Sequence, residues 1–258
     1  MTDVSLAHTL DRAILIRAER ELVFSFFTDN ARWAAWWGAG SSIDARRGGR
    51  IFIRYPGGTE VSGEVVEIAA PERIVFTYGY VTGAPIAPGG SLVTISLEPE
   101  PAGTRVRLSH AFAESSVRDH HVQGWRYQLS LFANAVANDA FGGADTVVDR
   151  WFAACSEPDA AVRDAAVDRI VAPGISMRDQ FSAVDGLPDL IAHLAAVHQF
   201  MPGMRLTRDG AVRQCQGMAL ADWIARGASG QEQGRGTNVF TLTPDGRIDG
   251  VTGFWNAR

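Results

Sequence analysis

The residue of this 258-residue chain best placed for chemistry is Asp179, in the stretch SMRDQF. In an extended strand alternate side chains share a face, so Met177, Asp179 and Phe181 point together. A carboxylate among large apolar side chains has a raised pKa and can take or give a proton near neutral pH. The stretch therefore predicts a general base or acid. The alternative is an aspartate bonded to backbone in the turn before Gly186.

A second carboxylate follows the same pattern in the stretch LADWIARG. Asp222 shares a face with Leu220 and Ile224, whereas Trp223 lies on the other face. Two interpretations stay open. Asp222 is a second catalytic carboxylate in a pocket, or it is an edge residue paired with an arginine such as Arg213.

A hydrogen-bond donor for a ligand oxygen is available in the stretch GTNVF, where Asn238 shares a face with Phe240. A carboxylate base and a polar donor in an apolar pocket suit proton abstraction next to a carbonyl, or an aldol-type cyclisation. No tyrosine follows Tyr127. An oxyanion donor in the second half is therefore Asn238, a tryptophan N–H, a histidine or a protonated aspartate.

The histidines do not predict a metal site. His193 and His198 lie five residues apart on a predicted helix, which sets them about 140° apart, and His198 is kept only as a ligand-binding candidate. His120 and His121 are adjacent, point about 100° apart on a helix, and are both expected in solvent. We expect neither a metal nor a cofactor.

The composition excludes several classes of function. All 24 basic residues are arginine, so lysine Schiff bases, a pyridoxal phosphate anchor and a phosphate-loop lysine are impossible. The net charge of −5 argues against a nucleic-acid binder. No apolar run approaches the roughly 18 residues of a membrane helix, and no secretion signal is evident, so we expect a cytoplasmic protein. The two cysteines, Cys155 and Cys215, lie in apolar stretches and are expected to be buried thiols.

The elements that position these residues fall into two domains, 1–141 and 144–258, divided near Gly142. The first reads as a strand, a helix over 19–29, three hairpins and a long helix from about Ser115 to Asn138, which predicts a curved antiparallel sheet over one helix. The second reads as two helices, a strand, a helix that begins near Pro188, and long strands with a hairpin at Asp245-Gly246.

Three tryptophans gather in RWAAWWGAG, where Trp36 and Trp37 are expected to follow a helix. They fill the core, line a cavity or face a partner, and the sequence leaves the three readings open. The best lining candidates between the long helix and the sheet are Trp125 and Phe132, and weaker ones come from strands: Phe52, Phe76 and Tyr78.

Residues 11–138 resemble the activator of heat-shock-protein-ninety ATPase-like branch of the START-like (SRPBCC) superfamily. The resemblance rests on IRAERELVFSFFTDNARWAAWWG, GEVVEIAAPERIVFTY and GWRYQLSLFANAV. Residues 146–256 resemble the SnoaL-like, ketosteroid-isomerase-like group of the nuclear transport factor two superfamily, through RDQFSAVDGLPDLIAHLAA and GTNVFTLTPDGRIDGVTGFW. The resemblances imply an α+β protein, a helix-grip domain followed by a cone-shaped barrel, each with an apolar pocket. Asp179 matches the general-base aspartate of the second group.

These implications lead to three candidate functions. The first is a small-molecule protein whose second domain is a cofactor-free isomerase, cyclase or hydrolase. The second is a binding or sensing protein with an assembly domain, homodimeric by resemblance, and the third is a co-chaperone. The expected partner is a small apolar or aromatic ligand. The ligand-binding candidates are Trp36, Trp37, Phe76, Trp125 and Phe132 in the first domain and Phe181, His198, Trp223, Asn238, Phe254 and Trp255 in the second.

Overall fold

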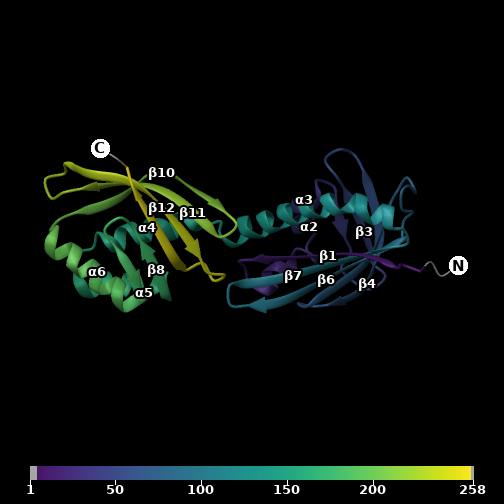
Figure 1. Ribbon diagram of the computed structural model, residues 1–258, viewed down its shortest axis with the longest axis horizontal. Helices are drawn as coiled ribbons and strands as arrows, with labels where there is room; N and C mark the ends of the chain where they lie inside the picture. The colour runs from purple at the N-terminus through teal and green to yellow at the C-terminus, as the bar shows by residue number, and fades with distance from the viewer. Residues whose placement is uncertain (1–4, 257–258) are drawn as a thin grey trace. The chain divides into compact units, whose positions relative to one another are not determined.

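The computed structural model describes residues 5–256 and divides into two compact α+β units, Met1–Ala137 and Asn138–Arg258 (Figure 1). The division falls inside helix α3 (Ser115–Ala140). The glycine pair at Gly142-Gly143, which the sequence favours as a boundary, lies in the turn between α3 and α4.

The first unit is built on a seven-stranded antiparallel sheet in the order β1-β7-β6-β5-β4-β3-β2. The three expected hairpins pair β2 with β3, β4 with β5 and β6 with β7. The strands are β1 (His8–Ile16), β2 (Ser42–Ile43), β3 (Arg50–Arg54), β4 (Glu60–Ala69), β5 (Arg73–Tyr80), β6 (Ser91–Glu100) and β7 (Gly103–Phe112).

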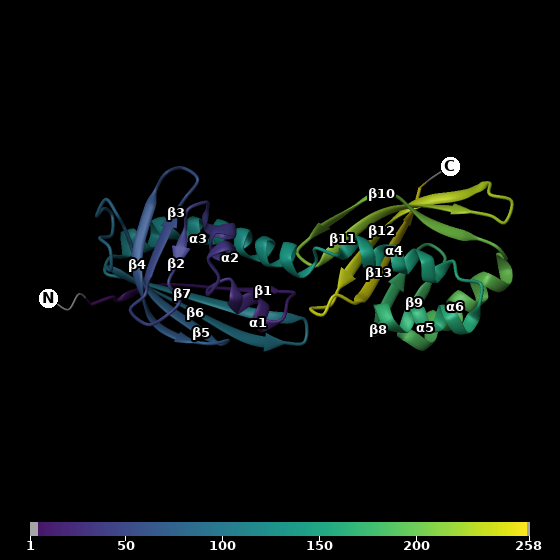
Figure 2. The same ribbon diagram turned by 180° about the vertical axis from the view of Figure 1, so that it is seen from behind.

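Helix α3 lies along one face of this sheet (Figures 1 and 2). Apolar residues recur at steps of three and four along this helix, and Trp125, Leu129, Phe132 and Val136 are all under 5% exposed, whereas Val122 at the start of the stripe is half-buried. Burial of this stripe against the sheet supplies the main apolar contact of the helix.

The tryptophan stretch differs from its prediction. The chain forms two short helices, α1 (Arg20–Ser25) and α2 (Asn30–Trp37), in place of one helix over 19–29. Asp29 begins the second helix because its side chain accepts a hydrogen bond from the Arg32 N–H at 2.9 Å. The tryptophans therefore belong to a helix and do not follow one.

The second unit combines a mixed six-stranded sheet with three helices, α4 (Ala144–Cys155), α5 (Ala160–Ile170) and α6 (Leu187–Phe200). The strand order is β10-β11-β12-β13-β8-β9, and only β13 and β8 pair in parallel. The strands are β8 (Val171–Arg178), β9 (Ala183–Asp185), β10 (Arg205–Cys215), β11 (Met218–Arg226), β12 (Glu232–Leu242) and β13 (Ile248–Trp255).

The cysteines do not share one environment. Cys155 is buried in α4, and burial raises the pKa of its thiol to about 12. Cys215 is exposed at the end of β10, so the expectation of a buried thiol is wrong there. Among the described helices, none combines the length and the hydropathy that a membrane span requires.

Candidate functional site

A cavity of about 440 Å³ lies inside the second unit, between helices α4 and α6 and the inner face of the sheet. Its wall is mostly apolar, and its polar side chains are few: Asp179, Ser182, His193, Gln233 and Asn238. The apolar lining is Trp151, Cys155, Met177, Phe181, Leu194, Val197, Met201, Met204, Leu206, Trp223, Ala225 and Trp255. Apolar pockets with a few placed polar groups are the usual form of a small-molecule site.

Asp179 combines both arrangements that the sequence leaves open. Strand β8 ends at Arg178, and the Asp179 N–H donates to the Ser182 carbonyl at 3.0 Å. Asp179 Oδ1 accepts from the Phe181 N–H at 2.7 Å and closes the turn, whereas Oδ2 accepts from Trp255 Nε1 at 3.4 Å. The turn holds one oxygen firmly, and the long bond leaves the other available to a ligand in the cavity.

Asn238 lines the same cavity and carries a hydrogen-bond donor, its NH₂ group. The side chain is buried, and its Oδ1 accepts from Trp223 Nε1 at 2.9 Å. Because the indole can only donate, this bond fixes the orientation of the amide and directs Nδ2 away from Trp223. Within residues 5–256 the Asn238 NH₂ group has no acceptor.

Gly253 keeps open the space between these two groups. It pairs with Asn238 across β12 and β13. A Cβ at Gly253 would lie 3.1 Å from Asn238 Oδ1, 3.2 Å from Asp179 Cβ and 3.8 Å from Asp179 Oδ2. Asp179 and Asn238 therefore border the same small space. Gly253 is not among the site residues predicted from the sequence, although a glycine inside a strand indicates a close approach.

Ser182 and His193 add a second polar pair to the lining. Ser182 Oγ lies 3.3 Å from His193 Nε2. The turn that positions Asp179 also positions Ser182. His193 has no role in the sequence prediction, because helix periodicity alone does not tell which of two helix histidines faces a cavity.

Three of the expected site residues lie outside this cavity. Asp222 is on the opposite face of β11 from Trp223, where it accepts from Thr237 and lies 3.9 Å from Arg213, so the expected arginine partner is observed, although β11 lies inside the sheet and not at its edge. Phe254 is 57% exposed, because it alternates with Trp255 on β13. His198 Nε2 bonds to the Cys155 carbonyl oxygen at 3.0 Å and joins α6 to α4.

No arginine lines the cavity, and Asp179 is its one carboxylate among the described residues. A ligand with a negative charge would meet repulsion from Asp179 without a compensating cation. Across residues 5–256, no three side chains of His, Cys, Asp or Glu gather closely enough to hold a metal ion.

The expected lining residues of the first unit form an aromatic core. Trp36 and Trp37 are each 2% exposed, with ring centroids 4.0 Å apart. Trp36 also packs on Phe132 at 4.8 Å, and Trp37 on Trp125 at 5.7 Å. Phe76 is fully buried against Trp33. Burial excludes the partner-surface reading, but the indole nitrogens of Trp36 and Trp37 are buried without a hydrogen-bond partner.

A buried polar chain runs beside this core. Trp125 Nε1 donates to His110 Nδ1 at 2.9 Å, so His110 carries its proton on Nε2 and donates to Ser91 Oγ at 2.8 Å. Ser91 Oγ in turn donates to the Tyr78 carbonyl oxygen. Burial lowers the pKa of His110 to about 2, so the imidazole stays neutral.

His121 belongs to the same interior, which corrects its expected exposure. Its Nδ1 lies 2.8 Å from the Val117 carbonyl oxygen and donates to it, so Nε2 accepts from the Tyr80 hydroxyl at 3.1 Å. Burial lowers the pKa of His121. His120 is exposed, as expected.

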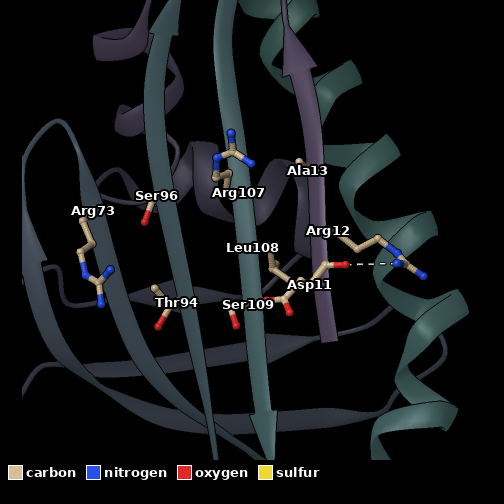
Figure 3. A pocket seen from close by; sticks show the side chains of 9 residues that line it. All are labelled: Asp11, Arg12, Ala13, Arg73, Thr94, Ser96, Arg107, Leu108 and Ser109. Atoms are coloured by element: carbon tan, nitrogen blue, oxygen red, sulfur yellow. Dashed lines mark hydrogen bonds between the residues drawn. The ribbon is translucent and has the colours of Figure 1, made fainter. Parts of the chain in front are cut away.

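The first unit also carries a recess of about 580 Å³ on its sheet (Figure 3). Arg73, Ser96 and Arg107 form one row across β5, β6 and β7. Each arginine already has a carboxylate partner, Glu67 at 3.2 Å and Glu98 at 2.9 Å. These exposed, paired charges offer a ligand less than the buried groups of the second unit.

Comparison with known proteins supports the resemblance of the first unit. Residues 17–137 match the family model described as activator of Hsp90 ATPase homolog 1-like protein, so the chain contains an AHSA1-like domain of the SRPBCC type. The match ends at residue 137, and the resemblance of residues 146–256 stays a prediction. A search of curated proteins finds no match.

Solved structures similar to the chain cover about half of it each. A SnoaL-like family protein from Agrobacterium tumefaciens, described as an isomerase by assignment only, is 27% identical, covering 43% of this chain and 96% of that one, with a TM-score of 0.42. The Aha1 dimer from Colwellia psychrerythraea is 20% identical, covering 50% and 96%, with a TM-score of 0.44. A Mesorhizobium loti protein is 19% identical, covering 51% and 98%, with a TM-score of 0.46.

Proposed function

We propose that the second unit binds a small, neutral, mostly apolar ligand and moves a proton on it, as an isomerase or cyclase does. The observation that carries the proposal is the presence of Asp179 and Asn238 in the lining of one apolar cavity, on either side of Gly253. Proton abstraction next to a carbonyl requires a base and a nearby hydrogen-bond donor, and this pair can supply both.

The geometry suggests how the groups would act. Asp179 Oδ2 removes a proton from the carbon next to a carbonyl, and the electron pair of that C–H bond moves onto the carbonyl oxygen. The Asn238 NH₂ group donates to that oxygen as its negative charge develops. The proton then returns from Asp179 to another carbon of the same molecule, so no cofactor takes part.

The test uses 2-tetralone, a flat bicyclic ketone with acidic protons beside its carbonyl. We expect the protein to accelerate the exchange of these protons for deuterium in D₂O, followed by NMR. Asp179→Asn should lower this rate at least about 100-fold, within the usual contribution of a general base, while tetralone still binds. Asp222→Asn is the matched control, because Asp222 lies on the opposite face of β11. An unchanged rate in Asp179→Asn would overturn the proposal.

A second candidate function, the binding of an apolar ligand by the first unit, is favoured by the unpaired indole nitrogens of Trp36 and Trp37. A buried donor without an acceptor costs about 1–3 kcal/mol, which a ligand oxygen would offset. Native mass spectrometry of the full chain, purified from cells, tests this candidate. We expect a bound small molecule that Trp36→Phe and Trp37→Phe lose and Asp179→Asn retains; a mass without adduct would contradict it.

The homodimer implied by the resemblance has a suitable surface on the outer face of the second sheet. On β11 the inner face carries Trp223 and three alanines, whereas the outer face carries Leu220 and Ile224, both only half-buried. Large apolar side chains that stay half-buried on the outer face of a sheet are typical of an interaction surface. We propose that two copies pair through this face.

A further inference from the structure

A groove of about 770 Å³ adjoins the cavity of the second unit. Groove and cavity share three lining residues, Phe181, Gln233 and Trp255. Beyond that shared wall the lining changes from thioether and aromatic side chains to amides and charges. One ligand can therefore occupy both spaces, with two parts of different polarity.

Trp255 lines both spaces and is fixed on several sides. Its Nε1 donates to Asp179 Oδ2, and its ring meets the rings of Trp223 at 4.8 Å and Phe181 at 5.3 Å, both edge to face. A Cβ at Gly234 would lie 2.9 Å from Trp255 Cζ3, so only glycine admits the ring at this position. A rigid indole of this kind offers an apolar face at low entropic cost.

The polar side of the groove suits hydroxyl groups better than ions. Gln180, Gln233 and Asn256 bring amide groups, which both donate and accept hydrogen bonds. The two charged residues neutralise each other, because Arg235 grips Glu232 through two hydrogen bonds of 2.9 and 2.8 Å. A neutral group with several hydroxyls matches this lining, and an anion gains no uncompensated cation there.

The exposure of Phe181 supports the same conclusion. Its side chain is 72% exposed although it borders an apolar cavity. A ligand that passes from the cavity into the groove would cover this ring and gain the free energy of its burial.

We propose that the ligand of this unit is a conjugate: an apolar ring system in the cavity and a neutral, polyhydroxylated substituent, such as a glycosyl group, in the groove. The inference rests on the proposed binding role of the cavity, but it does not depend on proton transfer by Asp179. Gln180 and Asn256 are its specificity-determining residues.

Isothermal titration with two matched probes tests the inference: 2-naphthol, and the β-D-glucoside of 2-naphthol. We expect the wild-type protein to bind the glucoside about tenfold more tightly, which corresponds to one or two net hydrogen bonds. The double variant Gln180→Ala/Asn256→Ala should lose this preference and keep its affinity for 2-naphthol. Gln199→Ala, an exposed amide on α6 outside both spaces, is the control and should change neither value.

Three results would overturn the inference. They are an absence of 2-naphthol binding, a glucoside preference that survives in the double variant, and tighter binding of 2-naphthyl phosphate than of the glucoside. Failure of the proposed proton transfer by Asp179 would give a different result. Proton exchange that is unchanged in Asp179→Asn refutes the isomerase proposal, while the glucoside preference of the wild type still stands.

Discussion

Gly253 stands opposite Asn238 in the β12–β13 ladder and lacks the side chain that would fill the gap between Asn238 and Asp179. A methyl group there would meet Asn238 Oδ1 at 3.1 Å and Asp179 Cβ at 3.2 Å, closer than most Cβ atoms approach a neighbour. The gap is too narrow for a methyl group, so the glycine lets the β13 backbone approach both polar groups that line the cavity.

The first prediction follows from this gap. Gly253→Ala should lower the rate of tetralone proton exchange at least tenfold, because the new methyl group would displace Asn238 or Asp179. Overpacking should also cost about 1 kcal/mol of unfolding free energy. Parallel exchange kinetics and urea unfolding measure both quantities.

Gly250→Ala is the matched control for that change. Gly250 lies on the same strand, and a Cβ there would meet Thr241 Oγ1 at 3.2 Å, outside the cavity. It should cost similar stability and leave the exchange rate unaltered. An equal loss of rate in both variants would mean that strain in β13, not occupation of the gap, is responsible.

The second prediction separates the donor function of Asn238 from its structural function. Asn238→Leu should lower the exchange rate about 100-fold, the usual effect of losing one oxyanion donor. It should also destabilise the unit by about 1–3 kcal/mol, because it leaves the Trp223 N–H buried without an acceptor.

The double variant Trp223→Phe/Asn238→Leu distinguishes the two effects. It removes the stranded donor, so part of the stability should return while the rate stays low. On the same samples, urea unfolding measures the stability and NMR measures the rate of proton exchange. Recovery of the rate together with the stability would show that Asn238 acts only through packing.

The sequence predicts this site only as far as strand alternation can identify the inward face of each strand. Strand alternation correctly separates Asp222 from Trp223, but it does not say which face of β11 is inward. Both faces carry large apolar residues, Trp223 with three alanines on the inner face and Leu220 with Ile224 on the outer face, so residue size does not identify the inward side. Only the tertiary arrangement of helices decides such a case.

The sequence also contains a signal that predicts the burial of His121. His121 lies four residues before Trp125 and shares its stripe on α3, so the stripe itself predicts burial. Because His121 is adjacent to His120, both were predicted to lie in solvent. Asp179 lies past the end of β8, and the turn that holds it depends on hydrogen bonds that no periodicity reports. The seven-stranded sheet was predictable because each hairpin carries its own turn signal.

The third prediction concerns acid stability of the first unit. His110 has a pKa of about 2 when folded and 6.5 when unfolded, so between these values only the unfolded chain binds the proton. The stability contribution is intact above pH 6.5 and is lost as the pH falls, by about 2 kcal/mol at pH 5. His121 acts in the same direction. Urea unfolding at pH 8 and pH 5, with hydrogen exchange of β7 peptides as the probe, measures the loss.

A conservative variant tests the cause of that loss. In His110→Gln the amide can accept from Trp125 and donate to Ser91, but it does not titrate, so most of the loss between pH 8 and pH 5 should disappear. His120→Gln changes an exposed neighbour and should keep the wild-type loss. If His110→Gln loses as much stability at pH 5 as the wild type, the acid sensitivity arises from other groups.

The fourth prediction concerns assembly through the outer face of β11 and β12. Light scattering after size exclusion should give twice the mass of one chain for the wild type, since Leu220 pairs with Val239 across these strands and Ile224 adds a third apolar side chain on the same face. Ile224→Arg removes that apolar side chain and places a second cation opposite Arg235, so it should give a single-chain mass, because an uncompensated charge in an interface is costly. Val162→Arg, at an exposed apolar position on α5, should leave the dimer intact. A monomeric wild type, or a dimer that tolerates Ile224→Arg, would contradict pairing through this face.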